Sequence, residues 1–209
     1  VAVIGIIYGA IVATMQPDLK RVIAYSSIAH LGFVVLGIFS FTEQGYSGAT
    51  FTMVSHGLTT GALFAIVGMM YDRTHTREIS DYSGLMKTVP VLSGAFLIAT
   101  FASVGLPGFS GFVGEFLAML GSFQAARFYT VVAVTGVIFA ALYLLWAYQR
   151  VFTGEPNELA KKMPDISFRE LLVVVPLLLM SLVLGLAPQY MLDRINPASD
   201  KATTHISKT

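Results

Sequence analysis

One apolar segment, residues 89–121, constrains the fold more than any other part of the chain. Because about 20 helical residues span a bilayer, its 33 residues are too many for one straight span and too few for two spans with a loop. Near its centre Pro107 removes a backbone hydrogen-bond donor, and Gly105, Gly108 and Gly111 loosen the same place. We therefore expect one discontinuous transmembrane helix, broken near Pro107.

The composition is that of an integral membrane protein. Of the 209 residues, 55% are hydrophobic and 12% are charged, about half the charged share of a soluble domain. Six apolar segments reach or approach spanning length, namely residues 1–14, 19–41, 48–71, 89–121, 128–152 and 170–192. The predicted fold class is therefore all-α, a polytopic transmembrane helix bundle with about six spans. A net charge of +1 gives no sign of nucleic-acid binding, and the lack of cysteine excludes thiolate metal sites and iron–sulfur ligation.

Polar connections divide the chain into four parts. We expect a helical bundle over residues 1–152, a polar loop over 153–169, a final transmembrane helix over 170–192 and a mobile polar tail over 193–209. The first segment is short for a span, so we interpret the sequence as the C-terminal piece of a longer protein. Alternating connections place nine Lys and Arg on one side of the membrane and four on the other. The side with nine is predicted to face the cytoplasm.

Three titratable side chains fall at similar depths in three consecutive spans. Glu115 follows Pro107 by eight residues, His30 lies near the middle of the second segment, and His56 lies about 12 Å into the third. An ionisable side chain within a membrane span is costly and therefore indicates function. Because an unperturbed imidazole titrates near pH 6.5, these residues predict a relay that takes up and releases protons.

Hydroxyl side chains accompany all three of these groups. Thr52, Thr59 and Thr60 share a helix face with His56, and a polar stripe inside a membrane must face protein or water. The predicted polar lining consists of Ser26, Ser27, Thr52, Thr59, Thr60 and Ser110. Hydroxyls and waters are needed because helix axes lie about 8–10 Å apart, farther than one hydrogen bond reaches.

These residues also have other interpretations. Either histidine alone is also explained as a hydrogen-bonding strut between helices. A zinc site would use His30, His56 and Glu115, but the sequence lacks a His-Glu-x-x-His motif, so we predict no metal. The segment 108–111 reads GFSG and resembles the Gly-x-Ser-Gly of rhomboid serine proteases, in which the partner histidine follows the serine. Here both membrane histidines precede Ser110, which argues against a protease.

A longer resemblance covers most of the chain. Residues 16–33 read QPDLKRVIAYSSIAHLGF, residues 53–58 read MVSHGL, and residues 105–116 read GLPGFSGFVGEF. In this order, and over residues 1–192, the chain resembles the antiporter-like subunits of respiratory complex I. The resemblance implies the second of two inverted five-helix repeats plus the last helix. It also implies that His30 and His56 are central relay histidines and that Glu115 is the terminal proton-handling carboxylate.

Within that family, the residue on the broken helix is informative. Most members carry Lys there, whereas the M-type subunits carry Glu, so Glu115 resembles the M type. The resemblance implies a non-redox, proton-translocating subunit with no cofactor of its own, FMN and iron–sulfur clusters being held by other subunits. Its implied partners are other membrane subunits of complex I, neighbouring antiporter-like subunits above all, together with lipid, protons and water. The implied location is the bacterial plasma membrane, or the mitochondrial inner membrane in a eukaryote.

Two competing functions stay open at this point. One is a subunit of a multisubunit cation/proton antiporter or of a membrane-bound hydrogenase, which share the fold. The other is a scaffold in which the buried polar groups serve only helix packing. The family's first-repeat Glu–Lys pair and the lysine that passes protons to the histidines have no counterpart in this sequence.

Overall fold

The computed structural model describes residues 1–206, and their side chains as far as Thr204. Within this range the chain is helical, and strand pairing is confined to one isolated bridge between Asp18 and Glu78. The helices are α1 (Ala2–Thr14), α2 (Leu19–Ile38), α3 (Glu43–Thr74), the 3-10 turn η1 (Ile79–Asp81), α4 (Leu85–Thr88), α5 (Pro90–Val104), α6 (Ser110–Ala125), α7 (Arg127–Phe152), α8 (Glu158–Lys162), α9 (Phe168–Leu186) and α10 (Gln189–Ile206).

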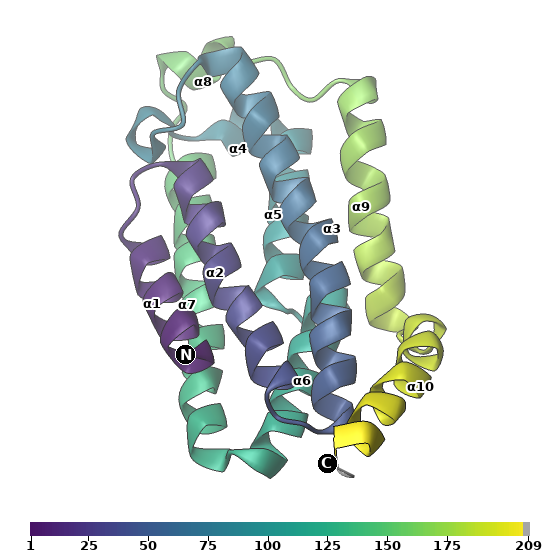
Figure 1. Ribbon diagram of the computed structural model, residues 1–209. Coiled ribbons are helices and arrows are strands. Elements are labelled where there is room, and N and C mark those ends of the chain that lie inside the picture. The colour runs from purple at the N-terminus through teal and green to yellow at the C-terminus, as the bar shows by residue number, and fades with distance from the viewer. Residues whose placement is uncertain (207–209) are drawn as a thin grey trace.

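The long helices run side by side along one axis (Figure 1). Four of them, α2, α3, α7 and α9, are long and apolar enough to cross a membrane, and α1 and α5 are shorter apolar helices. In Figure 1, α5 occupies the upper half of the bundle and α6 the lower half, so that together they fill one span. The protein is thus a multi-pass membrane protein, and the predicted all-α bundle with a discontinuous helix is confirmed.

The connections lie on the two sides as the sequence predicts. The α1–α2 turn, the α3–α5 connection and the α7–α9 loop that contains α8 lie toward the top of Figure 1, and the α2–α3 connection, the α6–α7 turn and α10 lie toward its base. The upper side carries the nine Lys and Arg. We call it the basic side, and it is the side that the positive-inside rule predicts to face the cytoplasm.

Side-chain caps explain two helix ends that differ from the sequence prediction. The Thr42 side chain accepts a hydrogen bond from the Gly45 backbone N–H, so α3 begins at Glu43 rather than near residue 48. Ser167 and Glu170 form a capping box that starts α9 at Phe168. The second span, predicted to reach residue 41, ends at Ile38.

The C-terminal region departs most from the prediction. The final span ends at Leu186 rather than at residue 192, because Ala187 precedes Pro188 and lies outside the α region, at φ −131° and ψ 62°. A separate helix, α10, then begins at Gln189, within the predicted final span, and continues to Ile206 through most of the stretch 193–209 that the sequence predicts as a mobile tail. The Ser47 hydroxyl donates to Asn196 Oδ1 and to Ser199 Oγ, at 2.9 and 3.0 Å, and so joins α10 to the start of α3. Residues 207–209 of the predicted tail lie outside the described residues.

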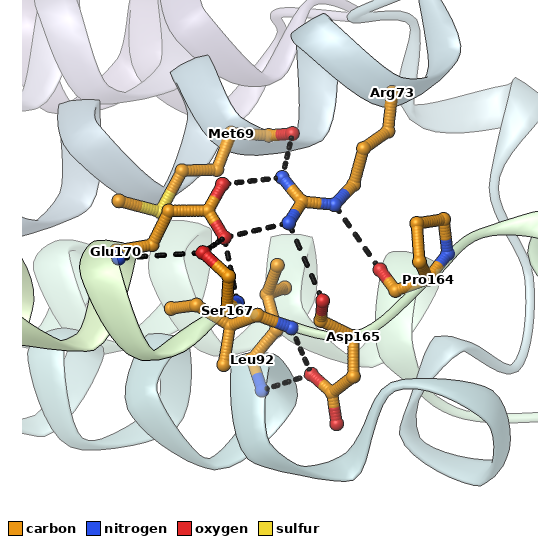
Figure 2. A network of polar contacts seen from close by, with 8 residues as sticks. Met69, Arg73, Leu92, Pro164, Asp165, Ser167 and Glu170 are labelled. Carbon is orange, nitrogen blue, oxygen red and sulfur yellow. Dashed lines mark hydrogen bonds and ion pairs between the residues drawn. The ribbon is translucent and has the colours of Figure 1, made fainter.

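A polar network on the basic side holds α3, α5 and α9 together (Figure 2). Arg73, at the end of α3, donates two hydrogen bonds of 2.7 Å to the two carboxylate oxygens of Glu170 on α9. It also donates to the Pro164 and Asp165 carbonyls. The Asp165 carboxylate in turn accepts from the backbone N–H groups of Val91 and Leu92, near the start of α5. The loop 153–169, predicted only as polar, is therefore a structured support for the final helix.

Candidate functional site

At the helix break, glycines adopt backbone conformations that other residues rarely adopt. Gly105 ends α5 at φ +80° and Gly108 lies at φ +108°, both in the region that favours glycine. Pro107 lies between them, and α6 resumes at Ser110. A Cβ added to Gly111 would lie 2.5 Å from the Ala102 carbonyl oxygen, so a glycine there lets the two half-helices overlap closely. Three of the four residues predicted at the break, Gly105, Gly108 and Gly111, thus have a structural reason to be glycine.

Small residues on α6 bring it into close contact with α3. A Cβ on Gly114 would lie 2.6–2.9 Å from the side chain and backbone of Thr52, and one on Gly121 would lie 2.2 Å from the Gly45 backbone nitrogen. From the α3 side, a Cβ on Gly48 would lie 2.2 Å from the Ala118 nitrogen. Such close backbone approach is typical of helix packing in membranes. It fixes the rotation of α6 and thereby the direction in which Glu115 projects.

Glu115 is paired with His30 on α2. The His30 Nδ1 and Glu115 Oε1 atoms are 2.6 Å apart, with the two side chains 3% and 7% exposed. A buried charge without a partner is strongly unfavourable, so this contact makes a carboxylate tolerable at mid-membrane depth. Residues 85 positions apart in the chain thus form one hydrogen-bonded unit, across which a single proton can be shared.

His56 on α3 lies beside this pair without being bonded to it. The rings of His30 and His56 are 5.8 Å apart between centroids, and His56 is half-buried. Thr60 Oγ1 lies 3.1 Å from His56 Nδ1 and 3.3 Å from Nε2. A cavity of about 10 Å³ touches all three titratable groups, and this is close to the smallest space that holds one water.

The structure separates the predicted polar lining into residues that reach the cavity and residues that do not. Thr52 and Thr59 line it and Thr60 contacts His56. Ser26 is buried, and its hydroxyl and that of Ser27 donate to the Ile23 carbonyl of their own helix. Ser110 is bonded to two other serines rather than to the titratable groups.

Four polar residues near the site were not predicted. Ser55 and Ser103 line the cavity. Ser55 also lies 2.7 Å from Ser110, which lies 2.8 Å from Ser181 on α9, measured between the hydroxyl oxygens. The Tyr143 hydroxyl on α7 lies 3.3 Å from His30 Nε2. Ser55 could have been found from its spacing to Thr52 and Thr59, which places it on their helix face. Tyr143 is one aromatic residue among many in an apolar span, so no sequence signal marked it.

Comparisons with known proteins agree with this architecture. Residues 1–140 match the family described as NADH:quinone oxidoreductase/Mrp antiporter, TM. The chain is 46% identical over 207 residues to NADH-quinone oxidoreductase subunit M of Mycobacterium tuberculosis, covering 99% of this chain and 37% of that protein. It is 48% identical over 196 residues to subunit M of Rhodobacter capsulatus, covering 93% of this chain and 38% of that protein. The chain therefore spans less than half the length of these relatives.

Solved structures give the same result. A chain of respiratory complex I from Thermus thermophilus aligns with a TM-score of 0.92 at 35% identity, covering 97% of this chain and 43% of that one. A chain of the Mrp complex from Dietzia aligns at 0.89 with 22% identity, which is a likeness of fold alone. From the family match and these alignments, the chain belongs to the membrane-spanning family shared by NADH:quinone oxidoreductase and Mrp antiporters.

Proposed function

We propose that this chain is part of the M-type, proton-translocating membrane subunit of a bacterial NADH:quinone oxidoreductase. The observation that carries the proposal is the buried His30–Glu115 pair at the helix break, with His56 beside it. The names of the similar subunits and the carboxylate on the broken helix support the M type. We further propose that the chain binds no redox cofactor and lies in the plasma membrane beside other membrane subunits of the complex. No observation here favours a cation/proton antiporter instead.

The pair can exist in two protonation patterns of similar shape. With the proton on His30 Nδ1 the unit is an imidazolium that donates to a carboxylate. With the proton on Glu115 it is a carboxylic acid that donates to Nδ1 of a neutral imidazole, which keeps its proton on Nε2. Switching between the two moves a proton along one hydrogen bond of 2.6 Å without moving a helix. A change in charge elsewhere in the complex alters the balance between these patterns through electrostatic interaction, which weakens little in a low-dielectric interior.

Transfer between the two histidines needs an intermediate carrier. The ring centroids of His30 and His56 are 5.8 Å apart, and His30 Nδ1 is already bonded to Glu115, so the two histidines do not exchange a proton directly. Instead, the proton passes through one water in the cavity that both histidines line. Occupation of that cavity by water then decides whether His56 and His30 exchange a proton. We propose that the relay is gated in this way.

Glu115→Gln in the full-length subunit tests the proposal, because it keeps the side-chain shape and removes titration. Proton pumping and NADH:quinone turnover are measured side by side in the same membranes, with each rate normalised to assembled complex. We expect pumping to be lost while assembly is preserved. Glu158→Gln is the matched control, because Glu158 lies in the exposed loop helix α8 with its side chain 79% exposed.

Two outcomes would contradict the proposal. Normal pumping per electron in Glu115→Gln would reduce Glu115 to a buried structural group. A loss of assembled complex in this variant and in His30→Gln, with normal pumping by whatever assembles, would show that the pair serves helix packing. Pumping lost in a fully assembled complex supports the relay and is not expected from a scaffold.

A further inference from the structure

Tyr143 lies in the middle of α7 with its hydroxyl directed at the site. It is one of the largest fully buried side chains among the described residues and is 1% exposed. Its hydroxyl oxygen lies 3.3 Å from His30 Nε2, on the opposite edge of the ring from Glu115. A buried tyrosine normally has a partner for its hydroxyl, and here that partner is the relay histidine.

The consequence is that both ring nitrogens of His30 are occupied. Nδ1 faces the Glu115 carboxylate at 2.6 Å, and Nε2 faces the Tyr143 hydroxyl at 3.3 Å. The imidazole is thereby held from both edges, and its plane is set by groups from two different helices, α6 and α7. The orientation of the His30 ring toward His56, at 37° between the ring planes, follows from these two contacts.

A phenol hydroxyl suits both protonation states of the histidine. With a neutral His30 that donates from Nδ1, the Tyr143 O–H donates to the Nε2 lone pair. With an imidazolium, the Nε2–H donates to the Tyr143 oxygen, and the phenol proton turns away from the ring. A hydroxyl can do both because it carries one donor and two acceptor lone pairs. A proton added to His30 is therefore accommodated by reversing one hydrogen bond.

On this basis we propose that Tyr143 is a positioning residue of the relay, which holds the His30 ring and stabilises its protonated form. The inference rests on the function proposed above and adds a residue from α7 to it. Tyr143 itself keeps its proton throughout, so it supplies geometry and a reversible hydrogen bond rather than a step of the proton path.

The surroundings of His30 determine how this can be measured. Of the described residues, the titratable groups that face it are Glu115 from α6, His56 from α3 and Tyr143 from α7. The remaining neighbouring helix, α1, contributes as its titratable side chain Tyr8, which is 60% exposed. A change confined to Tyr143 leaves the other two groups in place and alters the environment of His30 alone.

The test is Tyr143→Phe in the full-length subunit of the assembled complex, which keeps the ring and removes the hydroxyl. Tyr148→Phe is the matched control, because Tyr148 lies on the same helix and is 9% exposed. Among the described residues its hydroxyl contacts the Met86 sulfur, at 3.9 Å, and none of the titratable groups of the site. Proton pumping is recorded between pH 5.5 and 9, normalised to assembled complex. A purely structural tyrosine would change the amount of complex but not the pH profile.

We expect Tyr143→Phe to lower the pH at which pumping falls to half on its alkaline side. A hydrogen bond to a charged group stabilises more than one to a neutral group, so losing the Tyr143 hydroxyl destabilises the imidazolium more than the neutral ring. We expect the alkaline half-point of the profile to move by about half to one pH unit, which corresponds to about three- to tenfold in the proton affinity of His30. Tyr148→Phe should keep the wild-type profile. A Tyr143→Phe profile that coincides with the control overturns the inference.

The two proposals fail in different ways. If Glu115→Gln abolishes pumping and Tyr143→Phe leaves the profile unchanged, the relay stands and the role of Tyr143 is wrong. If Glu115→Gln leaves pumping unchanged, the relay itself is wrong, and no shift in Tyr143→Phe would rescue it.

Discussion

Arg73 is the side chain whose removal should loosen the protein most on the basic side of the membrane. It bridges the end of α3 to the start of α9 through both Glu170 oxygens and to the loop before it through the Pro164 and Asp165 carbonyls (Figure 2). The Arg73 and Glu170 side chains are 13% and 25% exposed, so solvent screens the pair only partly. We predict that Arg73→Met releases the segment that contains α8.

The magnitude follows from what the substitution leaves behind. Removing one partner of a buried pair costs about 3–5 kcal/mol, and the partial exposure here favours the lower end of that range. If about 3 kcal/mol is lost from the free energy of local opening, the open population rises more than a hundredfold, because each 1.4 kcal/mol is a factor of ten. Protease cleavage follows that population when opening and closing are fast relative to cleavage.

Trypsin cleavage after Lys161 and Lys162 on α8 measures this opening in the purified complex. Lys87→Met is the matched control, because it breaks the Lys87–Glu155 contact to the same loop, in which the two side chains are 52% and 88% exposed. Exposed pairs contribute little, so the control should be cleaved at the wild-type rate. Arg73→Met cleaved no faster than Lys87→Met would refute the argument that Arg73 holds this loop.

Two further predictions concern glycine. Gly114→Ala should cost about 1–3 kcal/mol of packing free energy, because its Cβ would lie 2.6–2.9 Å from Thr52, and it should therefore reduce the amount of subunit retained in the complex. The control Gly57→Ala has open space around the added Cβ and should leave that amount unchanged. Gly105→Ala should lower the melting temperature of the complex, since at φ +80° a side chain costs about 1–2 kcal/mol, while Gly94→Ala on the same helix should leave it unchanged or raised.

The sequence predicts those features of the fold that depend on nearby residues and misses those that depend on distant contacts. The length of segment 89–121 and the position of Pro107 predicted the broken helix because both act locally. The start of α3 was misplaced because Thr42 caps it from outside the apolar run. α10 was missed because its residues are polar and its packing depends on Ser47, roughly 150 positions earlier in the chain.

For the site, the sequence predicts which residues are involved but not which of them are paired. His30, His56 and Glu115 could be found because polar groups are rare in apolar spans, and the structure brings all three to one cavity. The partner of each could not be predicted, because the choice between His30 and His56 for Glu115 depends on the rotation of α6 that Gly114 and Gly121 set against α3. Depth can be counted along a helix, whereas rotation about its axis follows from packing against other helices.

The most exposed long helix explains why the break can exist in a membrane. Of the four long apolar helices in the described part of the chain, α9 is the least buried, and its buried residues, Val174, Leu178 and Ser181, form one narrow face. That face covers the break. Ser181 bonds Ser110, the first residue of α6, and a Cβ on Gly185 would lie 2.2 Å from the Gly108 carbonyl oxygen.

Lipid cannot satisfy backbone groups freed by a break, so an interrupted helix must be covered by protein wherever it meets the bilayer. At the unwound turn α9 supplies such cover beside Gly108, and it also makes the contact that fixes the first residue of α6. The position of Glu115 opposite His30 depends on α6 starting where it does. Helix α9 contributes no titratable group to the site, yet its contact with Ser110 is a condition for the geometry that places Glu115 opposite His30.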